Sequence, residues 1–302
     1  MTRPYLTVPV GFAEETELRE GPAARPWLAA LPVVLEELCG EWELAPQGPP
    51  WHGYVAVVVP VLDAMGTPAA LKVSWPGPDQ APEAPTLRAW DGAGAVRLLR
   101  HDGARWALLL ERLDGNRDLS AEPLDEAVGT IGSLLSRLHG ATGADEIPHL
   151  RETAARWVDE IPAGWAAAHP PWPAALRDEV VDTCHALGRA APDKLLHVDL
   201  HFDNVLAAER EPWLAIDPKG LVGDPAFESV AVLWNRVEEY GGDARAVRRR
   251  LDQWCEAAGI DRAAARAWAI ARIVEDALDR LLGAAGDEND ISTHQLLVAA
   301  LS

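Results

Sequence analysis

The hydrophobic pattern of the chain changes at residues 111–116, and this change constrains the fold more than any other feature. Before it, short runs rich in β-branched and aliphatic residues predict strands at 54–61, 69–75, 95–100 and 106–111. After it, apolar residues at helical spacing predict helices at 124–138, 150–168, 174–190, 226–240, 244–258, 262–283 and 290–301. A β-rich segment at 195–217 interrupts these helices. The pattern therefore predicts an α+β fold with a small β-rich lobe followed by a large helical lobe.

Three regions follow from this division. Residues 1–25 are polar and rich in Glu, Pro and Gly, and we expect them to form a loose N-terminal arm. Residues 26–112 form the predicted N-terminal lobe, which begins with a helix over 27–44. Residues 113–302 form the predicted C-terminal lobe, which carries the β-rich segment.

Composition limits the compartment and the partners. Three widely spaced cysteines without a CxxC pair favour a reducing compartment, and we expect no signal peptide and no membrane helix, hence a cytoplasmic protein. The net charge of −20 disfavours nucleic acid as a partner. It suits a cationic small substrate or serves only to keep the protein in solution, and both interpretations stay open.

Residues 197–204 read HVDLHFDN, so that Asn204 follows Asp199 by five positions and Asp217 follows beyond one short hairpin. In phosphoryl transfer, one carboxylate can accept the proton of the attacking hydroxyl. An Asn and a second carboxylate can hold Mg²⁺ against nucleotide phosphates. We therefore predict Asp199 as the catalytic base and Asn204 and Asp217 as magnesium ligands. The alternative is that they are ordinary turn residues.

Lys72 lies in an apolar strand of a chain that contains only three lysines. A lysine in such a strand can bind the α- and β-phosphates of ATP, steadied by a carboxylate from the following helix. Glu83, eleven residues further on, is the predicted partner. The alternatives are an exposed edge-strand lysine and an ordinary first-turn glutamate.

Two further segments are predicted to contact the nucleotide. Gly53 precedes the first strand, where a phosphate-covering loop is expected, although the chain has no GxGxxG there. The alternative is a glycine that marks the strand entrance. Glu111 to Leu113 lie at the change from sheet to helices, where backbone groups would bind the adenine edge.

Several other residues have competing interpretations. We expect His197 to order its loop rather than to bind zinc with His201. Asp203 is expected to be a solvated loop acid, and Asp224 to cap the helix that follows it. Lys219 is either a phosphate neutraliser or an ordinary loop lysine. The acids of the late helices are either ligands of a cationic acceptor or solvated residues: Glu228, Glu238, Glu239, Glu275, Asp276 and Asp279.

Together these residues resemble the aminoglycoside phosphotransferase family over roughly residues 25–300. The segments most similar to its streptomycin 6-phosphotransferase and hydroxyurea phosphotransferase branch are 71–76, 109–113, 197–201 and 213–224. The resemblance implies a bilobal protein-kinase-like fold, ATP and Mg²⁺ as cofactors, and the roles given above for the site residues. One departure is Val198, where this family usually has Gly.

The resemblance also implies a Mg-ATP-dependent small-molecule O-phosphotransferase, with an aminoglycoside or aminocyclitol such as streptomycin as the first-choice acceptor. The alternatives are a kinase of a metabolic sugar, amino sugar or amino alcohol, and a nucleotide-binding pseudokinase. A monomer and a homodimer are equally compatible with the sequence.

Overall fold

The computed structural model describes residues 6–143, 145–190, 192–283 and 291–302. The chain divides into two compact units, of which unit 1 comprises residues 1–92 and 96–113 and unit 2 comprises residues 93–95 and 114–302. The helices and strands of unit 1 are α1 (Val10–Glu20), α2 (Ala24–Glu41), β1 (Ala45–Pro46), β2 (Trp51–His52), β3 (Ala56–Leu62), β4 (Pro68–Ser74), α3 (Glu83–Trp90), β5 (Leu98–Asp102) and β6 (Ala107–Glu111).

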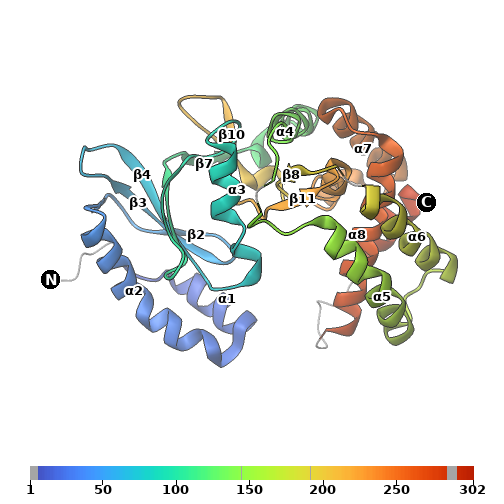
Figure 1. Cartoon of the computed structure of the whole chain (residues 1–302), viewed down its shortest axis with the longest axis horizontal. Helices are drawn as coiled ribbons and strands as arrows, with labels where there is room; N and C mark the ends of the chain where they lie inside the picture. Colours follow the sequence, from blue (N-terminus) through green and yellow to red (C-terminus); the bar gives the residue numbers. More distant parts are fainter. Residues whose placement is uncertain (1–5, 144, 191, 284–290) are drawn as a thin grey trace. The chain divides into compact units, whose positions relative to one another are not determined.

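Unit 1 is built around one antiparallel sheet with the strand order β1-β3-β4-β6-β5, in which β2 also pairs with β3. Alternate side chains of β3 and β4, such as Val57, Val59, Leu71 and Val73, pack with α1 and α2 in a buried core. Figure 1 shows α1 and α2 on one face of the sheet and α3 on the other. Because side chains alternate along a strand, Lys72 points away from this core and toward the α3 face.

Two expectations for unit 1 are wrong. The loose arm expected over 1–25 contains helix α1 from Val10 to Glu20, and residues 1–5 lie outside the described residues. Phe12 is fully buried, and its ring lies 6.1 Å from Trp27, so α1 is part of the core. The edge-strand interpretation of Lys72 also fails, because β4 is a central strand between β3 and β6.

Unit 2 combines helices with two small sheets. Its helices and strands are β7 (Asp114–Asp118), α4 (Leu124–Leu138), α5 (Leu150–Ala168), α6 (Ala174–Ala190), β8 (Lys194–Leu196), β9 (Val205–Ala207), β10 (Trp213–Ala215), β11 (Leu221–Gly223), α7 (Ala244–Ala258), α8 (Arg262–Leu282) and α9 (Ser292–Leu301). One sheet has the order β10-β9-β7, and the other pairs β11 with β8. Residue 290, where the last helix was predicted to begin, lies outside the described residues.

The helix predicted over 226–240 is wrong. This stretch instead contains two 3₁₀ turns, η5 (Pro225–Val230) and η6 (Val237–Tyr240). The buried Arg250 guanidinium on α7 donates to the carbonyls of Val232, Asn235 and Arg236. Arg236 itself has a positive φ of 54°. A continuous helix would need these carbonyls for its own hydrogen bonds, so the tertiary contact overrides the local pattern.

Candidate functional site

Lys72 and Glu83 form a buried ion pair in unit 1. The Lys72 Nζ donates to Glu83 Oε1 at 2.7 Å and to Oε2 at 2.8 Å. Lys72 is 7% exposed and Glu83 is 4% exposed. The pairing arises because Lys72 lies on the face of β4 opposite the α1–α2 core and Glu83 is the first residue of α3. This geometry fixes the ammonium group at the end of a long side chain.

The other predicted nucleotide contacts also lie in unit 1. Gly53 follows β2, and its N–H donates to the Ala56 carbonyl at 3.0 Å in a tight turn. Glu111 ends β6, and its Oε2 accepts the N–H of Arg97 at 3.2 Å. Leu113 is the last residue of unit 1. The roles of these three residues toward a nucleotide stay predictions.

Asp199, Asn204 and Asp217 come together in the β-rich segment of unit 2. Asn204 donates through Nδ2 to the Asp199 carbonyl at 2.8 Å, which ties the two ends of the loop. The β9–β10 hairpin returns the chain, so that the Ile216 N–H donates to the Asn204 carbonyl at 2.9 Å. Asp217 comes next, with a positive φ of 59°. The structure therefore brings together the three residues whose spacing first indicated a phosphoryl-transfer site.

His197 anchors the loop that carries Asp199, and its side chain is fully buried. Its Nε2 donates to the Ile216 carbonyl at 2.8 Å, and its Nδ1 accepts the Asp199 N–H at 3.3 Å. Burial lowers the pKa of His197, against the opposing effect of Glu228 and Asp199, so the ring is neutral near pH 7. The prediction that His197 orders the loop is confirmed.

Glu228 holds the backbone of the loop that carries Asp199, a contact that the sequence did not reveal. Its Oε1 accepts the backbone N–H groups of His197 at 2.6 Å and Val198 at 2.7 Å, and its Oε2 pairs with Nε2 of His139 at the end of α4. Burial alone would raise the pKa of Glu228, but His139 and the Val198 N–H outweigh it and hold that pKa below its usual range. Glu228 is 1% exposed, so the interpretation of this residue as a solvated or acceptor-binding acid is wrong.

Several smaller predictions have clear outcomes. Asp224 caps η5 by accepting the Ala226 N–H at 3.0 Å, as expected of a cap. Asp203 is exposed, and His201 Nδ1 accepts its N–H at 3.3 Å. Lys219 lies with its Nζ 3.8 Å from Asp217 Oδ2.

The late acids differ from one another in environment. Burial and the nearby Asp279 raise the pKa of Glu275 on α8 to about 7, against the opposing effect of Arg272. Asp276 pairs with Arg280 at 2.7 Å and with His294 at 2.6 Å. Glu238 and Glu239 are exposed on η6. These residues lie in unit 2, and their contact with an acceptor stays a prediction.

The donor set of the loop suits magnesium. Mg²⁺ is usually held by one or two carboxylates together with substrate phosphates. The Nδ2 of Asn204 donates to the Asp199 carbonyl, so its side-chain oxygen is the atom that can bind a cation. Asp217 supplies a partly exposed carboxylate. Within the described residues, no group of three or more His, Cys, Asp or Glu side chains could hold a metal by protein ligands alone.

Comparison with known proteins places the chain in a family. Residues 41–281 match the model of the aminoglycoside/hydroxyurea antibiotic resistance kinases. The chain is 42% identical over 279 residues to a streptomycin 6-kinase of Streptomyces griseus, which covers 91% of each chain. It is 44% identical over 271 residues to a hydroxyurea phosphotransferase of Kitasatospora aureofaciens, covering 87% of this chain and 77% of that protein.

Solved structures show the fold. An ethanolamine kinase of Plasmodium vivax superposes with a TM-score of 0.60 at 14% identity, covering 98% of this chain and 96% of that one. A spectinomycin phosphotransferase in complex with ADP and spectinomycin gives 0.51 at 14% identity, covering 88% and 93%. The predicted protein-kinase-like α+β fold is confirmed. In the part of the chain that the structure describes, no helix is long and apolar enough to span a membrane.

Proposed function

Because the chain belongs to the aminoglycoside/hydroxyurea antibiotic resistance kinase family and is a small-molecule phosphotransferase, we propose that it transfers the γ-phosphate of ATP to a hydroxyl of a streptomycin-like aminocyclitol. The observation that carries this proposal is the joint placement of Asp199, Asn204 and Asp217 by one loop and one hairpin. Two relatives that match more than nine-tenths of this chain are named for streptomycin, which supports the choice of acceptor. A reaction that consumes ATP also supports the expected cytoplasmic location.

Each residue has a distinct part in the proposed reaction. Asp199 orients the acceptor hydroxyl and accepts its proton as the oxygen attacks the γ-phosphorus and ADP leaves. Lys72, held by Glu83, binds the α- and β-phosphates. Asn204 and Asp217 would hold Mg²⁺, which when bound neutralises charge on the phosphate oxygens. Gly53 and the Glu111–Leu113 backbone would contact the nucleotide.

The proposal is tested by measuring ADP release from the purified protein with Mg-ATP and a panel of acceptors: streptomycin, hydroxyurea, simple sugars and amino alcohols. We expect turnover with streptomycin and a phosphorylated 6-hydroxyl by NMR. Turnover with a sugar or amino alcohol but not with streptomycin would reject the aminocyclitol in favour of a metabolic acceptor. Hydroxyurea is the second candidate, because a relative named for it is 44% identical.

The role of Asp199 has a matched control in the same loop. Asp199→Asn should lower kcat by about three orders of magnitude or more, because the hydroxyl loses its proton acceptor and its orientation. Asp203→Asn makes the same chemical change at an exposed position and should stay within about threefold of the wild type. Asp199→Asn with most of the wild-type kcat would show that another group accepts the proton.

A further inference from the structure

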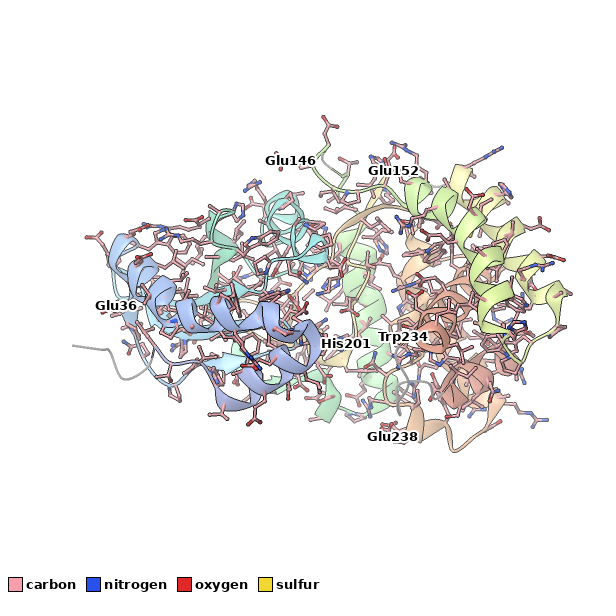
Figure 2. The ribbon with its side chains drawn as sticks, turned by 90° about the horizontal axis from the view of Figure 1, so that it is seen from below. Glu36, Glu146, Glu152, His201, Trp234 and Glu238 are labelled. Atoms are coloured by element: carbon pink, nitrogen blue, oxygen red, sulfur yellow. The ribbon has the colours of Figure 1, made fainter. Side chains whose placement is uncertain are left out.

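Arg272 on α8 reaches the backbone of the loop that carries Asp199. Its Nη1 donates to the carbonyl of Val198 at 3.2 Å and to that of Phe227 at 3.2 Å. The guanidinium lies 4.7 Å from the centre of the Phe227 ring and 5.5 Å from that of Trp234, which Figure 2 labels. Two carbonyls and two aromatic rings therefore hold the cation in one place.

Val198 is held in a conformation that its side chain resists. Its φ is 75°, in the left-handed region, where a β-branched residue is strained. Its N–H donates to Glu228 Oε1 at 2.7 Å, and its carbonyl accepts from Arg272. Both polar groups of this one residue are thus bound by charged side chains of opposite sign, from two different elements.

We propose that Arg272 is a positioning residue for phosphoryl transfer, which together with Glu228 locks Val198 in its left-handed conformation and thereby aims Asp199. The inference rests on the proposed role of Asp199 as the base. Val198 is the residue between His197 and Asp199, so a change in its backbone conformation redirects the Asp199 side chain while His197 stays anchored on Ile216.

The chemistry of arginine suits this position. The guanidinium is planar and presents several N–H groups in a fixed fork, so one side chain bonds the Val198 and Phe227 carbonyls while its faces meet aromatic rings. Burial lowers the pKa of Arg272, and the nearby Asp199 and Glu275 oppose this effect, which agrees with an enclosed cation. A direct effect of this charge on Asp199 is the competing explanation.

A double-mutant cycle with Arg272→Met and Val198→Gly separates the two explanations. Glycine adopts positive φ about as readily as negative φ, so the loop no longer needs the arginine to hold it there. We expect Arg272→Met to lower kcat on the order of tenfold to a hundredfold with little change in the KM for ATP. In the Val198→Gly background the same substitution should cost at least about fivefold less. Equal losses in the two backgrounds would overturn the positioning role.

Two further measurements test whether a loss of kcat in Arg272→Met comes from the loop and not from a general effect of removing an arginine from α8. Arg262→Met removes an exposed arginine from the same helix, where it pairs with Asp252, and should leave kcat within about twofold of the wild type. Hydrogen exchange of the amides in residues 197–204 needs no acceptor and so remains informative even if the proposed acceptor is wrong. We expect faster exchange in Arg272→Met than in the wild type, and unchanged exchange would contradict the inference.

Discussion

At the scale of single residues, the Lys72–Glu83 pair affects both the stability of unit 1 and, in the proposed reaction, the binding of the nucleotide phosphates. Both side chains are nearly inaccessible to water, so neither charge is solvated if the other is removed. The same ammonium group is the proposed phosphate ligand. A loss of activity after substitution of Lys72 alone could therefore come from a less stable fold or from the missing phosphate ligand.

We expect Lys72→Met to lower the free energy of unfolding by about 3 kcal/mol and to lower kcat more than about a hundredfold, because it leaves Glu83 buried and the phosphates without their cation. Adding Glu83→Gln removes the uncompensated charge and should restore most of the stability but none of the activity. Urea unfolding and the ADP-release assay measure the two quantities. Recovery of kcat in the double variant would mean that Lys72 has only a structural role.

The residue scale also shows what spacing can predict. Asp199, Asn204 and Asp217 were predicted because they are close in sequence and lie on one short β-rich segment. Glu228 and Arg272 were missed as partners of the loop because they lie 30 and 74 residues from Val198 and reach it only through the tertiary fold. Local patterns carry no signal for such contacts.

At the scale of elements, α4 approaches α7 closely at one of its two neighbouring glycines and not at the other. A Cβ added at Gly132 would lie 2.6 Å from the Cβ of Ala257 and 3.1 Å from the backbone nitrogen of Ala258, both on α7. A Cβ at Gly129, three residues earlier, would meet nothing within 4 Å. The close approach of α7 therefore depends on Gly132 and not on Gly129.

The two glycines form a matched pair for a stability measurement. Gly129→Ala should raise the free energy of unfolding by about 0.5–1 kcal/mol, because Ala favours the helix without a clash. Gly132→Ala brings the same helix preference but must displace α7, and we expect a net loss of about 1–2 kcal/mol. Thermal and urea unfolding of both variants test the sign, and stabilisation by both would show that α4 and α7 are more loosely packed.

Elements with a strong periodic pattern were predicted well, and elements set by tertiary contacts were not. The helices at 124–138, 150–168, 174–190 and 244–258 have the predicted bounds, because their apolar stripes face a core. Strand β7, with the sequence DGNRD, has no apolar residue and therefore no strand pattern, and only its pairing with β9 in the fold defines it. Between the two 3₁₀ turns of 225–240, the distant Arg250 binds carbonyls that a continuous helix would need for itself.

At the scale of the whole molecule, 47 acidic residues against 27 basic ones leave a net charge of −20. Such a surface attracts cations and speeds their association, and salt screens this attraction over a Debye length of about 10 Å at 0.1 M. The same field repels a nucleotide. If the acidic surface helps to bind a cationic acceptor, the binding of that acceptor should therefore weaken as salt is added.

Streptomycin carries guanidinium groups, so its kcat/KM at saturating Mg-ATP should fall by about threefold to tenfold between 0.05 M and 0.5 M NaCl. The KM for Mg-ATP at saturating streptomycin is the internal control. It should not rise over the same range, because screening weakens the repulsion of an anion. A kcat/KM for streptomycin that stays within about twofold would assign the acidic surface to solubility alone, since the acceptor would then gain nothing from the field.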